Sequence, residues 1–114
     1  MIQIALLGCG TIAGGVTRLL EMNAADIEQK LGVGIKITRV LARTPKKARA
    51  LGFKGEAITQ NLDDILTDPD VQIVVELMGG VDAARYAVEA AICAGKQVVT
   101  ANKDLIAQIG RAHV

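Results

Sequence analysis

The sequence has almost no aromatic side chains, and its charges nearly cancel. Its 114 residues include one Phe, one Tyr and no Trp, so it offers no row of aromatic rings on which single-stranded bases could stack. Thirteen basic residues stand against 12 acidic ones, and a net charge of +1 gives no general attraction to nucleic acid or to an anionic membrane. Any anion-binding site must therefore be local.

Cysteines and long apolar runs are also scarce. Cys9 and Cys93 are too few for a disulfide framework and lack the spacing of a metal site. No apolar run approaches the ~20 residues that a membrane span needs, and no basic leader precedes the first apolar segment. We therefore expect a cytoplasmic protein that binds neither a metal nor a membrane.

The sequence consists mainly of aliphatic segments, some with the pattern of a strand and others with the pattern of a helix. Apolar residues make up 51% of the chain and charged residues 22%, which is typical of one globular domain. Strand patterns occur at 2–7, 35–42, 71–78 and 97–101, and the loop 52–59 can hold a short strand. Helical patterns occur from the first glycine turn to Leu31, at 45–51, at 62–66 behind the cap Asn61, at 82–94, and after Asn102. This alternation predicts an α/β fold of Rossmann type, a doubly wound parallel sheet with helices on both faces.

A glycine-rich turn joins the first strand to the first helix. Gly8 permits a tight turn, Gly10 lets the backbone approach a pyrophosphate, and a small third residue, Ala13, lets helix and strand pack closely. The N-terminus of the helix adds free N–H groups and about half a positive charge. We predict that this turn binds NAD or NADP. The predicted contact residues are Gly8, Cys9, Gly10, Thr11, Ile12 and Ala13.

Cys9 lies within this turn and allows two interpretations. A thiol close to a helix N-terminus can have a lowered pKa and become a reactive thiolate. The simpler interpretation is a small residue that lines the cofactor, and we prefer it.

The end of the second predicted strand bears on the choice of dinucleotide. A carboxylate there would bind the ribose 2′-OH and favour NAD. The sequence has Arg43 instead, with Lys46, Lys47 and Arg49 beyond it, and a cation can hold a 2′-phosphate. At least one of the later three is expected on a solvated helix face, whereas Arg43 directly follows the strand. We therefore predict NADP in preference to NAD, bound through Arg43.

Two further strand ends carry residues that suit a ligand. Gly79 and Gly80 would let the backbone pass close to a nicotinamide ribose, although a simple turn explains them nearly as well. Glu76 interrupts apolar residues and needs a partner if it is buried; its role stays open. Lys103 falls in the first turn of the last helix, where a cation opposes the helix dipole. Such a costly placement favours a function over an exposed lysine.

Three segments together resemble homoserine dehydrogenase. They are GCGTIAGGV at 8–16, VELMGG at 75–80 and AGKQVVTANK at 94–103, and the resemblance runs in register from Met1 to about Gln108. It implies the cofactor-binding part of an oxidoreductase that interconverts L-homoserine and L-aspartate 4-semialdehyde with NAD(P)(H), on the route to threonine and methionine.

The resemblance also implies roles for particular residues. Gly79, Gly80 and Thr100 would line the nicotinamide side, and Lys103 would be the catalytic lysine beside nicotinamide and substrate. Ala13 departs from the commoner glycine, with only a small expected shift in helix–strand packing. The family's substrate domain, through which the parent enzyme is expected to form a homo-oligomer, is absent, so this stretch alone is expected to bind cofactor weakly and to be inactive.

The last six residues do not continue the resemblance. Residues 1–108 form the predicted NAD(P)-binding domain, whereas Gly110 interrupts the final helix. The segment 109–114, IGRAHV, equals one translation frame of a widely used short-read sequencing adapter, and we hypothesise that it is not natural sequence. His113, the only histidine, is therefore given no catalytic role.

Two other interpretations stay open at this point. One is another dehydrogenase or reductase of amino-acid metabolism with a similar cofactor domain, of the aspartate dehydrogenase or dihydrodipicolinate reductase type. The other is a stand-alone nucleotide-sensing module. The sequence that follows Gln108 in the gene would distinguish them.

Overall fold

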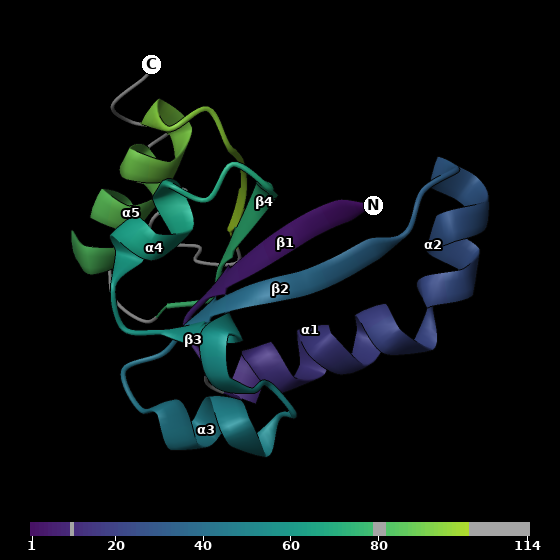
Figure 1. Cartoon of the computed structure of the whole chain (residues 1–114), viewed down its shortest axis with the longest axis horizontal. Coiled ribbons are helices and arrows are strands. Elements are labelled where there is room, and N and C mark those ends of the chain that lie inside the picture. Colours follow the sequence, from purple (N-terminus) through teal and green to yellow (C-terminus); the bar gives the residue numbers. More distant parts are fainter. Residues whose placement is uncertain (10, 79–81, 101–114) are drawn as a thin grey trace.

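The strands of the protein form one parallel sheet. The structure is a computed structural model that describes residues 1–9, 11–78 and 82–100, with 11 and 12 in their backbone only. In chain order the elements are β1 (Ile2–Leu7), α1 (Thr11–Met22), α2 (Ala24–Leu31), β2 (Ile35–Leu41), α3 (Pro45–Ala50), the 3-10 turn η1 (Gly55–Ala57), β3 (Ile58–Thr59), α4 (Leu62–Leu66), β4 (Val71–Glu76), α5 (Asp82–Cys93) and β5 (Gln97–Thr100). The strand order is β3-β2-β1-β4-β5, and all pairings are parallel (Figure 1). The predicted Rossmann-type α/β fold is confirmed.

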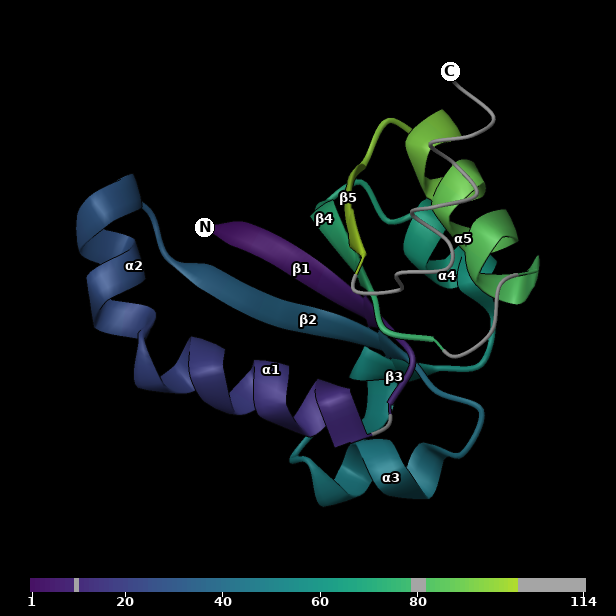
Figure 2. The ribbon, with the colours of Figure 1, turned by 180° about the vertical axis from the view of Figure 1, so that it is seen from behind.

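Strand β1 is buried on both faces because its side chains alternate between two apolar clusters. Ile4 and Leu6 pack in the cluster that includes Ala13 of α1 and Ala48 of α3. Ala5 and Leu7 pack in the other, with Ile65 of α4 and Val74, Ala87 and Ala91 of β4 and α5. Figures 1 and 2 show α1 and α3 on one side of the sheet and α4 and α5 on the other. Helices therefore cover both faces, as the near-continuous apolar sequence of this strand predicts.

The first helical segment is broken where one continuous helix was predicted. Asn23 separates α1 from α2, and both its backbone N–H and its side-chain Nδ2 donate to the carbonyl of Leu19, at 3.1 and 2.9 Å. An asparagine side chain that competes for backbone groups favours such an interruption. Helix α2 has no buried residue and ends at Gly32, whose φ of 78° is left-handed.

Strand β4 ends at Glu76, earlier than the predicted 78. The N–H of Leu77 still donates to the carbonyl of Leu7 at 2.9 Å, whereas the N–H of Met78 donates to the side-chain carboxyl group of Glu76 at 2.6 Å rather than to a neighbouring strand. Residue 101, the helix predicted after Asn102, the boundary at 108 and the hypothesised tail 109–114 lie outside the described residues. Within the described part, no helix is long and apolar enough to cross a membrane.

Candidate cofactor site

The turn after β1 lies at the edge of the sheet where the parallel strands have their carboxyl ends, here called the carboxyl edge. It closely contacts the segments that end β2 and β4. Gly8 has a φ of +105°, and a Cβ placed there would lie 3.2 Å from the carbonyl carbon and oxygen of Leu77. Its N–H donates to the carbonyl of Leu41 at 2.8 Å. The turn thus passes between the ends of β2 and β4, on the strands where the sheet order reverses, which is where ligands bind in open α/β sheets.

A cavity of about 700 Å³ opens beside this turn. Its lining residues are Gly8, Cys9, Leu41, Ala42, Arg43, Thr44, Lys47, Gln60, Leu77 and Met78. Two of them are cations and none is a carboxylate. The donor set therefore fits an anionic ligand, and the structure brings together three predicted site residues, Gly8, Cys9 and Arg43.

Cys9 is a partly buried thiol in the cavity wall. Its burial raises the pKa of the thiol above its ordinary value, and the charge of Lys47 opposes this only in part. The thiol is therefore neutral at physiological pH. This contradicts the alternative of a low-pKa thiolate and agrees with a small residue that lines the site.

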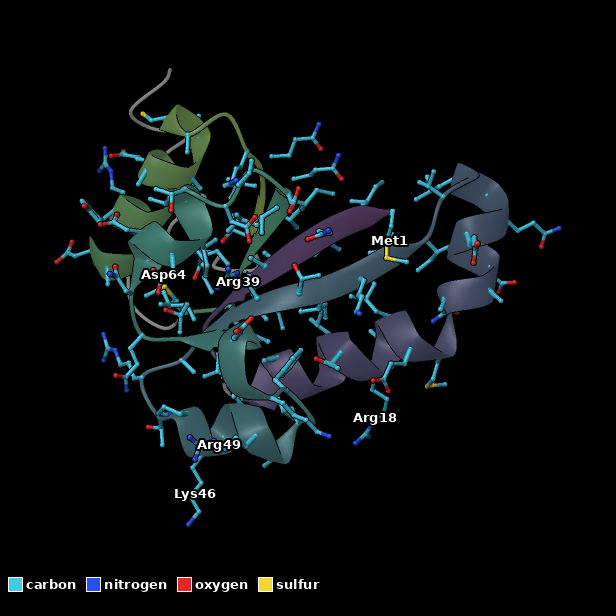
Figure 3. All side chains as sticks on the ribbon, in the orientation of Figure 1. Met1, Arg18, Arg39, Lys46, Arg49 and Asp64 are labelled. Carbon is cyan, nitrogen blue, oxygen red and sulfur yellow. The ribbon has the colours of Figure 1, made fainter. Side chains whose placement is uncertain are left out.

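Lys47 is distinguished from its neighbours only by the structure. All three cations of α3 are exposed, but Lys47 lines the cavity and Lys46 and Arg49 do not; Lys46 extends away from the sheet (Figure 3). The sequence alone could not show which of the three cations of this short helix faces the cavity. The solvated-face interpretation thus holds for Lys46 and Arg49.

Gln60 and Thr44 are cavity residues that sequence reasoning missed. Gln60 follows β3, which pairs with the end of β2, and its Nε2 donates to the carbonyl of Arg43 at 3.1 Å. This contact steadies the segment that carries Arg43. No local signal in the sequence marks Gln60, because its position depends on where a two-residue strand pairs.

The start of α1 is arranged for close packing behind the turn. Ala13 is fully buried and belongs to the cluster around Ile4 and Leu6, so a small side chain is required where α1 approaches β1. Thr11 and Ile12 form the first turn of α1. Gly10 lies outside the described residues.

Glu76 is completely buried and has two partners. Besides the N–H of Met78, its carboxylate accepts the hydroxyl of Thr100 at 2.5 Å. The two residues stand opposite each other in the β4–β5 pairing. The partner that a buried carboxylate needs is therefore present. Three other predicted site residues, Gly79, Gly80 and Lys103, lie outside the described residues.

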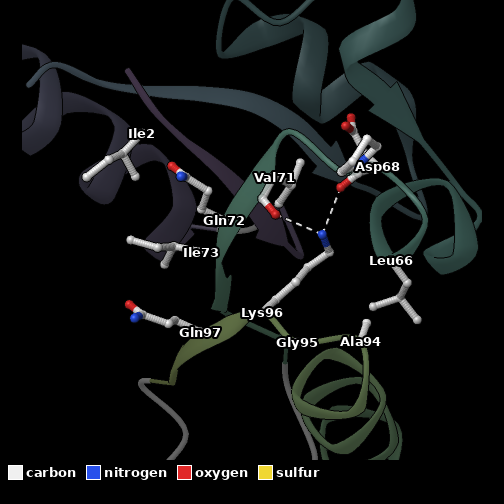
Figure 4. A pocket seen from close by; sticks show the side chains of 11 residues that line it. Ile2, Leu66, Asp68, Val71, Gln72, Ile73, Ala94, Gly95, Lys96 and Gln97 are labelled. Carbon is white, nitrogen blue, oxygen red and sulfur yellow. Dashed lines mark hydrogen bonds between the residues drawn. The ribbon is translucent and has the colours of Figure 1, made fainter.

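A second cavity, of about 480 Å³, lies at the opposite edge, by the amino ends of β1, β4 and β5 (Figure 4). Lys96 lines this cavity, and its ammonium group donates to the carbonyls of Asp68 and Val71, both at 2.8 Å. Asp68 accepts Nε–H of Arg39 at 3.0 Å. These groups bind one another across the edge, so the candidate site is the first cavity. The described residues include no cluster of side chains able to hold a metal ion.

Comparisons with known proteins agree on one family. A family model described as the NAD-binding domain of homoserine dehydrogenase matches residues 8–113. Homoserine dehydrogenases of Bacillus subtilis and Lactococcus lactis are 35% and 42% identical, each over 96% of this chain. The structure is similar, with a TM-score of 0.87 and 45% identity, to a homoserine dehydrogenase from Thiobacillus denitrificans, over 96% of this chain and 25% of that one. The chain spans about a quarter of the length of the curated relatives it matches.

Proposed function

The chain belongs to the homoserine dehydrogenase family, whose NAD-binding domain it matches, and we propose on this basis that it is the cofactor-binding part of an oxidoreductase interconverting L-homoserine and L-aspartate 4-semialdehyde. The observation that carries the proposal is the cation-lined cavity beside the Gly8 turn, at the carboxyl edge where the strand order reverses. The bound nicotinamide supplies the hydride chemistry, and the protein binds and orients it.

The residues divide between two halves of the dinucleotide. The pyrophosphate lies over 8–13, against the N-terminus of α1. Thr100 ends β5 on the other side of β1, and with Gly79 and Gly80 it lines the nicotinamide side. Lys103 is the catalytic lysine beside nicotinamide and substrate. Family resemblance supports the roles given to Thr100, Gly79, Gly80 and Lys103.

The remaining three quarters of the relatives' length is expected to hold the substrate-binding residues. Residues 1–114 alone therefore bind cofactor without turning over substrate. The parent enzyme is proposed to be a cytoplasmic homo-oligomer that assembles through that other part.

NADP is the favoured cofactor because of the charges at the cavity. Arg43 follows the carboxyl end of β2, Lys47 lines the same cavity, and no carboxylate does so. A 2′-phosphate gains charge-assisted hydrogen bonds from such a pair, whereas a ribose 2′-OH finds no acidic partner among the lining residues.

Titration of NADPH and NADH against the wild type and Arg43→Ala tests this preference. Arg43→Ala should weaken NADPH binding about tenfold, the equivalent of one charge-assisted hydrogen bond, and leave NADH binding nearly unchanged. Lys47→Ala should act in the same direction. Lys46→Ala is the matched control on the same helix and should change neither affinity. Equal losses for the two cofactors in Arg43→Ala would contradict the proposal.

A further inference from the structure

Gln60 lines the cavity from a segment that is anchored on both sides. Before it, the carbonyl of Thr59 accepts the N–H of Ala42 at 2.9 Å, where β3 pairs with the end of β2. After it, the N–H of Asn61 donates to Thr59 Oγ1 at 3.0 Å, and Asn61 caps α4. The backbone of Gln60 is therefore held at the carboxyl edge, beside Arg43.

A backbone carbonyl sets the orientation of the side-chain amide of Gln60. Nε2 donates to the carbonyl oxygen of Arg43 at 3.1 Å. Turning the amide over would place Oε1 against that carbonyl, and neither oxygen has a hydrogen to donate. The hydrogen-bond network thus assigns Nε2 to the side of Arg43. This assignment does not depend on the ionisation of any group.

One N–H and the acceptor Oε1 of this amide remain for a ligand. A glutamine amide has two N–H donors and one acceptor oxygen. Among the described residues, the amide of Gln60 has no partner besides the carbonyl of Arg43, and the side chain lines the cavity. Gln60 therefore offers a donor and an acceptor from one rigid group.

The cations of the cavity indicate which part of a dinucleotide lies near Gln60. Arg43 and Lys47, the proposed partners of the 2′-phosphate, line the same cavity. The 2′-phosphate is carried by the ribose that bears the adenine, so the adenine lies one sugar away from these cations. Its 6-amino group is a donor and its N7 an acceptor, and a glutamine amide can bind this pair in a bidentate manner.

We propose that Gln60 is a specificity-determining residue that reads the adenine edge of the cofactor, with Oε1 accepting from the 6-amino group and the carbonyl of Arg43 locking the amide in that orientation. A purine with an oxygen in place of the 6-amino group sets two acceptors against each other. A free glutamine could turn over and donate to that oxygen, whereas Gln60 would lose its bond to Arg43. The inference rests on the proposed function, since it requires an adenine dinucleotide in this cavity.

Titrations of the full chain with NADPH and with its hypoxanthine analogue test the selectivity. The analogue changes only the base, so the fluorescence of the reduced nicotinamide follows the binding of both ligands. The wild type should bind NADPH about tenfold more tightly, the effect expected of one base-edge pair. In Gln60→Leu, which keeps the size of the side chain but loses both polar groups, the affinity ratio should fall toward one. Gln60 is exposed, so this variant should fold like the wild type, which circular dichroism checks.

Two control variants separate reading of the base from support of the Arg43 segment. Arg43→Ala removes the guanidinium but keeps the carbonyl that orients Gln60, so it should weaken both ligands equally and keep the ratio. Gln72→Ala removes an exposed glutamine that lines the cavity at the opposite edge and should change neither affinity. If Gln60 only steadied the segment that carries Arg43, Gln60→Leu would also weaken both ligands equally.

The outcomes separate the inference from the proposed function. Equal affinity of the wild type for NADPH and the analogue, or a wild-type ratio in Gln60→Leu, overturns the inference and leaves the proposed function intact. Failure of the wild type to bind either NADPH or NADH overturns the proposed function itself.

Discussion

At the scale of single residues, the glycines of this protein differ in what constrains them. Gly8 combines a φ of +105° with the carbonyl of Leu77 at 3.2 Å from the place of a Cβ. Gly32 has a φ of +78°, but nothing lies within 4 Å of such an atom. Both positions strain any other residue. Only at Gly8 would a side chain also push two strand ends apart.

Gly8→Ala should therefore reduce both stability and cofactor binding. The left-handed backbone costs roughly 1–3 kcal/mol with an alanine, and the contact with Leu77 adds to it while displacing the turn. The measurements are the urea midpoint and the dissociation constant for NADPH.

Gly32→Ala separates strain from displacement. It should lower the urea midpoint through the same backbone strain, but leave NADPH affinity at the wild-type value, because Gly32 ends α2 far from the turn. Comparable affinity losses in both variants would show that Gly8 acts through stability alone.

At the scale of elements, the five-residue helix α4 depends on its cap. The Oδ1 of Asn61 accepts the N–H of Asp63 at 3.0 Å, and the N–H of Asn61 in turn donates to Thr59 Oγ1 at 3.0 Å. So short a helix is not stable by itself. The helix contributes Ile65 to the apolar core, where this side chain is fully buried against β4 and α5.

Loss of this cap should destabilise the protein measurably. Asn61→Ala should lower the free energy of unfolding by about 1 kcal/mol, seen as a lower thermal midpoint with no change in the denaturant m-value. Asn61→Asp keeps an acceptor oxygen at the helix N-terminus and should stay within a few tenths of the wild type. A similar loss in both variants would argue against the cap as the cause.

At the scale of the whole molecule, the amino edge is held by contacts between segments far apart in the chain. Lys96 of the α5–β5 turn donates to the carbonyl of Asp68 in the α4–β4 connection and to that of Val71, the first residue of β4, and Arg39 of β2 donates to the side chain of Asp68. The backbone N–H of Asp70 is the main cause that lowers the pKa of Asp68, with Arg39 and Lys96 contributing against desolvation. The charged form of Asp68 is thus favoured by folding.

The pH dependence of stability follows from the direction of that shift. Because the pKa of Asp68 is lower in the folded protein, its contribution is complete above the ordinary value of 3.8 and is lost as the pH falls through the folded pKa. Asp68→Asn should therefore lower the free energy of unfolding by roughly 1–2 kcal/mol near neutrality, with the difference from wild type shrinking below pH 3.8.

Urea unfolding at several pH values measures this difference. Glu89→Gln breaks the exposed Arg85–Glu89 pair on α5 and should change stability by at most a few tenths of a kcal/mol. A difference between wild type and Asp68→Asn that stays constant down to pH 2 would contradict the assigned role.

The sequence by itself determined the strands and helices, the parallel sheet and the Gly8 turn. These features depend on periodicity, caps and glycines at fixed local offsets, which neighbouring residues encode. The same patterns missed the break at Asn23, because a side-chain amide there competes with an otherwise acceptable helix.

Only the tertiary structure decided which side chains share the site. Lys47 faces the cavity and Lys46 does not. Gln60 meets Arg43 across 17 residues, and Glu76 meets Thr100 across 24. The physical reason is that these contacts arise from the pairing of β3 with β2 and of β5 with β4, and no local period specifies which strands become neighbours.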